Sequence, residues 1–492
     1  MYRRICSLLL LSAAFVAGCR STDTTAVSTY AEAAVLCEKV LPVTGTFLNL
    51  AYQDVRNKYT NPPAVDYTDP MLWHAKVNEM KKMGMEYLVL MAVANEGRSF
   101  YPSDLMPPAY NSHLQSPVDA IMEAAERNGM KVFMSTGWAK DQDDNLRDPA
   151  IKQRQIQMMT ELAGIYGDHP AMYGWYLPVE DCLGPVLTDY AVDAVNALTD
   201  KARSLTPGKK VLISPYGIFN SDFDDPRYEQ QMLRLKVDII AYQDEIGCVR
   251  ERYPLPRLRE NWKRIRAIHD KTDVEMWANC ESFAWEVATN DRTSALVPAP
   301  MGRFLGQLAA ASAGGAEKII SFIMYGMFED PASPYQIGQP QWSNHAYDEY
   351  MAWISGDRRW KAAEKAFLGY YGQMGQENPE GWDVRRPGTY EIVEELEKET
   401  NVESLLARIL VCHKDDIFAP EMLALSASRD GEDYRLVQVK SCPVFPNTRH
   451  DAFVDCVLFD GLDKLLPEDT RFVRISYSSP HKTALDRIVL NP

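Results

Sequence analysis

The chain has 492 residues, of which 46% are hydrophobic and 24% are charged, and its formal net charge is -16. This composition is that of a globular protein with enough apolar material for one large core and a second, smaller one, and it excludes a disordered chain. The acidic balance argues against nucleic acid as a partner, because phosphate groups call for clustered Lys and Arg side chains.

At the amino terminus, Arg3 and Arg4 precede an apolar stretch that ends in the four residues Val-Ala-Gly-Cys at 16–19. This stretch is shorter than the roughly 20 residues of a membrane-spanning helix, so we expect residues 1–18 to be a cleaved signal peptide. The four residues resemble a bacterial lipobox. The resemblance implies lipidation of Cys19 and a protein held at the cell envelope on a bacterial membrane, either facing the periplasm or exposed at the surface. The alternative is a soluble signal peptide with an incidental cysteine.

After a tether and N-terminal segment at 19–43, residues 44–358 repeat one pattern of a short apolar run, a loop and an amphipathic helix. The apolar runs are 46–51, 87–93, 131–136, 172–177, 210–215, 237–242, 274–278 and 319–325. Several of these runs are nearly continuous in Val, Ile, Leu and Met, which is typical of parallel strands covered by helices. Eight such units predict an α/β fold, a closed (β/α)8 TIM barrel.

The sequence pattern changes beyond this region. We expect a linker and a charged helix at 359–407, the helix lying at about 390–408, followed by a mainly-β domain at 408–492 built from short strands. Asp430-Gly431 is a strong hairpin signal, and several strands joined by turns predict a sandwich-like domain. Its role is open between carbohydrate binding and a packing partner for the barrel.

Two glutamates close strand-like runs of the predicted barrel. Glu180 ends the run that begins at Met172, and Glu281 ends the run that begins at Val274, which makes these the fourth and seventh strands. Barrel enzymes place their chemistry at the carboxyl ends of their strands, so we predict that both glutamates are catalytic. The bland alternative for each is a cap or an ion pair in a loop.

Other polar and aromatic residues fall near the same strand ends or on the same predicted strands. Alternation along a strand places Trp277 and Asn279 on the face of Glu281, and Tyr176 on the face of Glu180, with Trp175 pointing the other way. Aromatic rings that stack on sugar rings, together with amides and carboxylates that bind hydroxyl groups, suit a carbohydrate substrate. The predicted substrate-binding residues are Asn49, Trp138, Tyr176, Tyr216, Gln243, Asp244, Trp277, Asn279 and Tyr325. Glu329 and Asp330 are expected to be solvated loop acids.

Two carboxylates on opposite sides of a cleft can cleave a glycosidic bond, one as proton donor and the other as nucleophile. Apolar neighbours near Glu180 would raise the pKa of its carboxyl group by desolvation, as a proton donor requires. The separation of the two groups would decide between retention and inversion of anomeric configuration.

Glutamates after strands four and seven resemble the large retaining clan of β/α-barrel glycoside hydrolases. That clan usually has Asn directly before the acid/base glutamate, where this chain has Val179. The segments at 45–50, 83–90, 174–180 and 242–247 are similar to those of uncharacterised bacterial lipoproteins regarded as candidate glycoside hydrolases. This resemblance covers roughly residues 44–355 and implies that Gln243 and Asp244 are site residues beside the two glutamates.

Other chemistries lack their residues. The eight histidines include no His-x-His pair, no lysine ends a strand as a Schiff-base residue would, and no glycine-rich loop follows a strand. We therefore expect neither a metal nor an organic cofactor. The competing function from another class is a non-catalytic glycan-binding surface lipoprotein on a barrel scaffold.

Overall fold

The computed structural model describes most of the chain from residue 40 onward. The described ranges are 40–50, 66–91, 93–140, 146–249, 255–285, 296–299, 301–356, 382–397, 401–412, 415–442 and 453–491. The predicted signal peptide, the lipidation site and the tether up to residue 39 lie outside these ranges.

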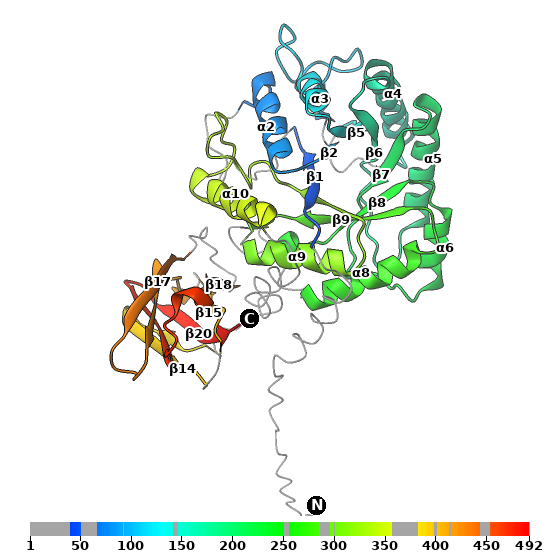
Figure 1. The fold of residues 1–492 in the computed structure, drawn as a ribbon. Helices are drawn as coiled ribbons and strands as arrows, with labels where there is room; N and C mark the ends of the chain where they lie inside the picture. Colours follow the sequence, from blue (N-terminus) through cyan, green and yellow to red (C-terminus); the bar gives the residue numbers. More distant parts are fainter. Residues whose placement is uncertain are drawn as a thin grey trace, which may run out of the picture.

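Eight parallel strands close into a barrel, and they follow one another around it in chain order. The strands are β1 (Val43–Leu48), β2 (Tyr87–Leu90), β5 (Lys131–Ser135), β6 (Met172–Tyr176), β7 (Lys210–Ile213), β8 (Ile239–Gln243), β9 (Glu275–Glu281) and β12 (Lys318–Phe322). Each of the eight predicted runs overlaps one of these strands by at least half of the strand's length, so the predicted (β/α)8 barrel is confirmed. Figure 1 shows the strands at the centre, with the helices arranged outside them.

Helices follow the barrel strands, and the longer ones cover its outer face. They are α2 (Pro70–Lys82), α3 (Pro117–Arg127), α4 (Pro149–Tyr166), α5 (Asp189–Leu205), α6 (Pro226–Arg234), α7 (Ile246–Val249), α8 (Leu255–His269), α9 (Met301–Ala313) and α10 (Pro340–Ser355). Local sequence explains where several of them begin. Asp69, Ser116, Asp148 and Asp225 each accept a hydrogen bond from a first-turn amide, and each is followed by a proline.

The lumen of the barrel is filled by two groups of aromatic side chains. Near the amino ends of the strands, the Trp277 ring lies 5.0 Å from Tyr87 and 5.9 Å from Phe133, measured between ring centroids. Near the carboxyl ends, Phe47 packs 5.2 Å from Tyr176 and 5.8 Å from Phe322. The lumen is therefore a packed core at both of these levels, as is usual in such barrels.

A β-bulge in strand β6 sets the direction of its last side chains. The pairing between β5 and β6 shifts after Val132, so that Phe133 pairs with Gly174. The Trp175 indole then points outward and donates a hydrogen bond of 2.7 Å to Thr206 at the end of α5. The Tyr176 ring points into the lumen, as predicted, and the chain continues from there toward Glu180.

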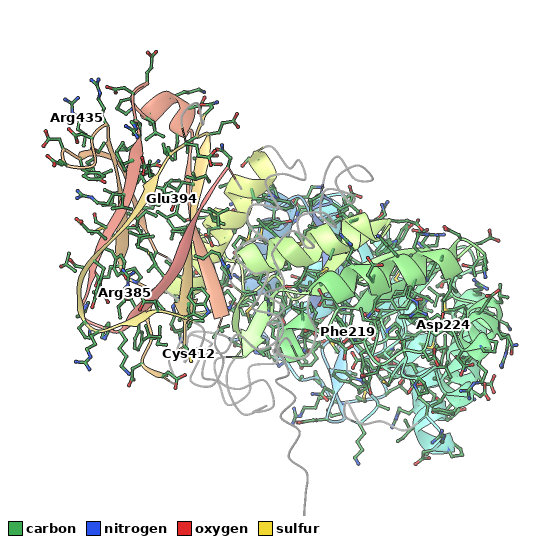
Figure 2. All side chains as sticks on the ribbon, turned by 90° about the horizontal axis from the view of Figure 1, so that it is seen from below. Phe219, Asp224, Arg385, Glu394, Cys412 and Arg435 are labelled. Carbon is green, nitrogen blue, oxygen red and sulfur yellow. The ribbon has the colours of Figure 1, made fainter. Side chains whose placement is uncertain are left out.

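Several short elements lie at the carboxyl end of the barrel. They are the hairpin β3 (Ala94–Asn95) and β4 (Arg98–Ser99), the hairpin β10 (Phe283–Trp285) and β11 (Leu296–Pro298), and the helix α7. The loop after β7 includes Phe219 and Asp224, which Figure 2 labels on the barrel. These segments form parts of the walls above the lumen.

A buried ion pair fixes the loop after β12 to helix α2. The Lys76 ammonium lies 2.6 Å from Glu329 Oε1 and 3.0 Å from Glu79 Oε2, and the Lys76 and Glu329 side chains are fully buried. The expectation that Glu329 is a solvated loop acid is therefore wrong. Asp330 is also mostly buried and pairs with the exposed Lys82.

The C-terminal region consists of two antiparallel sheets with their own apolar core. One sheet contains β13 (Val384–Arg385), β20 (Thr483–Leu490), β15 (Ser404–Val411) and β18 (Phe453–Asp460). The other contains β14 (Gly388–Glu395), β19 (Phe472–Ser479), β16 (Met422–Ser428) and β17 (Arg435–Ser441), and a short helix α12 (Leu462–Leu465) follows β18. Figure 2 shows the two layers, with Arg385, Glu394 and Arg435 labelled on them. The predicted sandwich-like domain is confirmed.

The helix predicted at about 390–408 is wrong, because residues 388–395 form strand β14 and residues 404–411 form strand β15. Strand β14 pairs along its whole length with β19, and Tyr390 and Ile392 pack against the core of the domain. Tertiary pairing overrides the helical preference of the glutamates in this segment. The β domain thus begins before residue 408. The hairpin signal at Asp430-Gly431 is correct, since Gly431 has a positive φ of 81° between β16 and β17.

Among the described residues, no helix combines the length and the apolar character that a membrane span requires.

Candidate active site

Glu180 lies above the lumen, four residues beyond the end of β6. Its side chain keeps exposed surface, and it lines a cavity with a volume of about 130 Å³. The surrounding walls exclude enough water that desolvation raises the pKa of its carboxyl group. A hydrogen bond from Gln243 opposes part of this effect. Glu180 is thus a carboxyl group with a raised pKa that remains open to a ligand.

Gln243 ends strand β8 and links Glu180 to the neighbouring strands. Its Nε2 atom donates to Oε1 of Glu180 at 3.3 Å and to the carbonyl oxygen of Ser214 at 2.9 Å. The Ser214 hydroxyl in turn accepts a hydrogen bond of 3.1 Å from Asn279 Nδ2. Within the described residues the Asn279 Oδ1 atom is buried without a hydrogen-bond partner. Polar groups from the carboxyl ends of four consecutive strands, β6 to β9, are therefore linked by hydrogen bonds beside Glu180.

Glu281 is the last residue of β9, on the same face of that strand as Asn279 and Trp277. Its side chain is 4% exposed, and its carbonyl oxygen accepts a hydrogen bond of 3.0 Å from Gln307 in α9. The Glu281 carboxylate packs against Gly247, where an added Cβ would lie only 2.8 Å from Oε2. Because Gly247 has no side chain, the Glu281 carboxylate can occupy this space.

Asp244 points away from the lumen and is fully buried behind Glu281. Its Oδ1 accepts the backbone N–H of Glu281 at 3.1 Å, and its Oδ2 accepts Nε2 of Gln307 at 2.7 Å. Burial raises the pKa of the Asp244 carboxyl group, and the hydrogen bond from Gln307 acts in the opposite direction. Asp244 is therefore placed to hold the end of β9, and its predicted contact with substrate is corrected to this positioning role.

Tyr216 and Gly217 form a wall beside Glu180. The backbone N–H of Tyr216 donates to the Asp181 carbonyl at 3.3 Å, and its carbonyl accepts from Leu183 at 2.8 Å. The N–H of Gly217 donates to Oε2 of Glu245 at 2.7 Å. Glu245, after β8, therefore holds the loop after β7 at Gly217. That loop holds the segment next to Glu180 through the bonds of Tyr216 to Asp181 and Leu183.

Several acidic groups surround the Tyr216 hydroxyl. The side chain is 38% exposed, and its pKa is raised first by burial and then by Cys182, Asp181, Glu180 and Glu245. Burial also raises the pKa of Glu245 to about 7. Glu245 is a non-glycine residue with a positive φ of 54°, a conformation that costs energy and often occurs at functional sites.

The cavity beside Glu180 is built from the loops after β5 and β6 and from helices α4 and α5. Its lining residues are Gly137, Trp138, Leu146, Gln155, Pro178, Val179, Glu180, Asp181, Tyr190 and Ala191. Gly137 allows the close approach of two loops, because its φ is +63° and a Cβ there would meet the Ala94 carbonyl oxygen at 2.5 Å. The backbone N–H of Trp138 donates to that same carbonyl at 2.9 Å, which holds the backbone of this loop at the cavity wall.

Five of the nine predicted substrate-binding residues lie near the two glutamates. Trp138, Tyr216 and Gln243 lie around Glu180, and Tyr176 lies just beneath it, close enough for the glutamate to raise the pKa of the tyrosine further. Asn279 lies in the lumen below Glu281, bonded to Ser214.

Three other predicted residues belong to the framework. Trp277 is fully buried in the lower aromatic group, four residues before Glu281, so it is too deep for a ligand. Tyr325 is fully buried against Trp73 of α2, and its hydroxyl donates to the Asn49 carbonyl oxygen. Asn49 itself is 4% exposed. Among the described residues that line the cavity beside Glu180, neither Asn49 nor Tyr325 is present.

The predicted substrate-binding residues do not include Glu245, Gln155 or Tyr190. Glu245 has the same parity as Gln243, so strand alternation favours it over Asp244. Gln155 and Tyr190 lie on helices whose distance from the strand ends is set by loop conformation, and no pattern in the sequence identifies them.

Within the part of the chain that the structure describes, no three His, Cys, Asp or Glu side chains are grouped closely enough to hold a metal ion.

The family described as "Domain of unknown function (DUF4434)" matches residues 43–335, which is more than half of the chain and nearly all of the barrel. No curated protein matches the chain.

Several solved structures share the general architecture. A candidate α-L-fucosidase from Bacteroides thetaiotaomicron is 19% identical, with a TM-score of 0.49 over 65% of this chain and 97% of that one. A glycoside hydrolase family 5 protein from Bacteroides vulgatus is 12% identical, with a TM-score of 0.41 over 89% of each chain. A GH99 endo-α-mannosidase from Bacteroides thetaiotaomicron is 14% identical, with a TM-score of 0.40 over 66% of this chain and 98% of that one.

Proposed function

The chain belongs to the DUF4434 family, and we propose that it is a glycoside hydrolase that uses Glu180 and Glu281 as its two catalytic carboxyl groups. The observation that carries the proposal is the pair of glutamates at the carboxyl ends of the fourth and seventh barrel strands, above a lumen sealed by aromatic side chains. Catalytic groups of barrel enzymes come from this end.

Glu180 is the proton donor in this proposal. A general acid in glycoside hydrolysis must be protonated when the substrate arrives, and desolvation raises the pKa of Glu180 in that direction. The carboxyl group remains exposed at a cavity, so a glycosidic oxygen can reach it. Gln243 fixes the orientation of Oε1 and leaves Oε2 for the substrate.

Glu281 is the nucleophile, which attacks the anomeric carbon as the bond to the leaving oxygen breaks. Its position is held from behind, since Asp244 binds its N–H and Gln307 binds its carbonyl oxygen. A nucleophile fixed at its backbone loses little freedom on reaching the transition state. Water would then hydrolyse the glycosyl-enzyme ester with Glu180 acting as base, which gives overall retention.

The test is hydrolysis of a panel of glycans and aryl glycosides by the wild type and by Glu180→Ala and Glu281→Ala. Both variants should lose at least about 10²-fold in rate on any substrate that the wild type cleaves. Glu86→Ala is a matched control, because Glu86 is an exposed glutamate directly before β2, at the opposite end of the barrel. If Glu180→Ala and Glu281→Ala both cleave at the wild-type rate, the catalytic assignment is wrong.

The competing function is glycan capture without catalysis. One observation favours it: among the described residues, the cavity that Glu180 lines does not include Glu281. A binding protein would hold a glycan in the panel without cleaving it, and both alanine variants would bind it as the wild type does.

The proposal includes a location at the cell envelope, supported by the lipobox-like residues that end at Cys19. Expression of the full-length chain in bacteria fed a labelled fatty acid tests it. The wild type should incorporate label and Cys19→Ala should not. Equal incorporation by both would exclude Cys19 as the lipidation site.

A further inference from the structure

The cavity beside Glu180 has walls that suit part of a sugar ring. Its volume is about 130 Å³, less than the ~150 Å³ of an enclosed cavity that holds benzene, so it can receive one face of a sugar whose other atoms lie outside it, beside the exposed Glu180. Two of its lining residues, Trp138 and Tyr190, have amphipathic aromatic rings, which suit the C–H faces of a sugar. Gln155 adds an amide to this wall, and it is held by the Thr136 hydroxyl.

One polar group of this cavity lacks a partner. Within the described part of the chain, the Tyr190 hydroxyl oxygen is buried and has no hydrogen-bond partner. Burial raises the pKa of this hydroxyl, so it stays protonated and can both donate and accept. An unsatisfied buried hydroxyl costs free energy, and a ligand hydroxyl in the cavity would recover it.

The described lining residues carry two carboxyl groups, those of Glu180 and Asp181, and no Lys, Arg or His. Glu180 holds its proton in its proposed role as acid, so the negative charge among the lining residues comes from Asp181. The guanidinium carbon of the exposed Arg147 lies 4.2 Å from the Tyr190 ring centroid, and Arg147 is not one of the lining residues. A uronate in the cavity would therefore meet a like charge at Asp181 and, among the described lining residues, no cation.

The position of the cavity indicates which part of a substrate it would hold, and this step rests on the proposed function. A proton donor acts on the oxygen that joins the reacting sugar to the leaving group. The reacting sugar must reach Glu281 with its anomeric carbon, and among the described residues Glu281 is outside the cavity. The group that occupies the cavity is thus on the leaving side of the bond.

We propose that this cavity is the leaving-group subsite and that it binds a neutral sugar ring in preference to a uronic acid. The substrate is then a glycan in which the residue after the cleaved bond is uncharged. Trp138 supplies the apolar face of the subsite, and Tyr190 supplies a hydroxyl contact that selects for sugar hydroxyl groups.

The experiment measures binding and needs no turnover. Methyl glucoside, methyl galactoside and methyl mannoside are titrated into the purified full chain at neutral pH, each beside its 6-carboxylate counterpart, with saturation-transfer NMR as readout. We expect at least one neutral sugar to bind about tenfold or more tightly than its carboxylate counterpart. Tyr190→Phe should weaken that binding about 3- to 10-fold, as the loss of one hydrogen bond predicts.

Matched variants separate the subsite from other effects. Tyr434→Phe removes a hydroxyl in the β domain and keeps the ring that lies 3.9 Å from Arg474, so it should bind as the wild type does. Trp138→Ala should weaken binding more than Tyr190→Phe, with circular dichroism as the check on folding. Glu281→Ala should bind normally, so the subsite is tested even if the chain hydrolyses nothing.

The proposal is overturned if no neutral sugar of the panel binds, if the carboxylate sugars bind equally or more tightly, or if Tyr190→Phe binds as the wild type does. Loss of hydrolysis in Glu281→Ala with normal sugar binding supports both the function and the subsite. If hydrolysis is lost in Glu281→Ala but Tyr190→Phe binds sugar as the wild type does, the proposed function stands and the proposed subsite is wrong.

Discussion

The side-chain amide of Gln243 donates a hydrogen bond of 3.3 Å to Oε1 of Glu180. The two residues come from strand β8 and from the loop after β6, with β7 between them, and the same amide nitrogen also binds the Ser214 carbonyl at 2.9 Å. The hydrogen bond favours the ionised form of Glu180, while desolvation favours the protonated form and is the larger effect. Gln243 therefore tunes and orients the proposed proton donor.

Replacing Gln243 by Leu should shift the pH dependence of hydrolysis. Glu180 must be protonated to act as acid, so the rate falls as pH rises through its pKa. Removing a hydrogen bond that lowers this pKa raises it, and the basic limb of the kcat/KM profile should move to higher pH. A basic limb that stays in place or moves down would contradict this role for Gln243.

Gly247→Ala should impair the proposed nucleophile without unfolding the chain. The new Cβ would lie 2.8 Å from Oε2 of Glu281, 3.0 Å from its Cβ and 2.7 Å from the Phe283 carbonyl oxygen. A displacement of about 1 Å at a catalytic group can cost about 10²-fold in rate, so we expect a loss of that size in kcat. Gly164→Ala is the control, because it lies in α4 with no atom within 4 Å of the added Cβ. Equal rates for the two variants would indicate that Glu281 is not involved.

His269 should make the stability of the protein depend on pH. It is fully buried, it is hydrogen-bonded to Tyr242 and to the Val274 carbonyl, and desolvation lowers its pKa to about 4. The unfolded chain therefore binds more protons between about pH 6.5 and pH 4, and the free energy of unfolding falls as pH falls through that range. The contribution of this one group is about 3 kcal/mol.

Denaturant unfolding of the wild type and of His269→Gln at several pH values measures this effect. The difference in unfolding free energy between the two proteins should shrink as the pH is lowered from about 7 to about 4. His113→Gln, which changes an exposed histidine, serves as the control. A difference that is constant with pH would show that His269 does not titrate in this range.

Lys76→Met should strongly destabilise the barrel. It leaves Glu329 buried without its ammonium partner at 2.6 Å, and the loss of one partner of a buried pair costs about 3–5 kcal/mol. Lys82→Met removes a pair whose lysine is 60% exposed, and it should cost less than about 1 kcal/mol. Comparable unfolding midpoints for the two variants would contradict the account of the buried pair.

The sequence predicts the barrel strands well because parallel strands covered by helices are apolar along most of their length. It also predicts the direction of Trp175 and Tyr176, although the bulge that produces it appears only in the structure. The β domain is less predictable at its start, since the glutamates of β14 favour a helix and only pairing with β19 makes them a strand.

The site is predicted in part. Strand position correctly places Glu180 and Glu281 at the carboxyl end of the barrel. The prediction treats Gln243 and Asp244 alike, whereas the structure bonds Gln243 to Glu180 and Asp244 to Gln307 of α9. Depth is harder to predict, because Trp277 has the correct parity but lies in the lower aromatic group. The cavity walls depend on loop conformations and on where α4 and α5 begin, which no local pattern determines.

The anomeric configuration of the products, followed by NMR, tests the role of Glu281 as nucleophile. We expect the wild type to release a sugar of retained configuration from a glycoside that it cleaves. We also expect azide to restore turnover to Glu281→Ala and to yield a glycosyl azide of inverted configuration. A wild-type product of inverted configuration, or a Glu281→Ala variant that cleaves at the wild-type rate, would contradict the assignment of Glu281 as nucleophile.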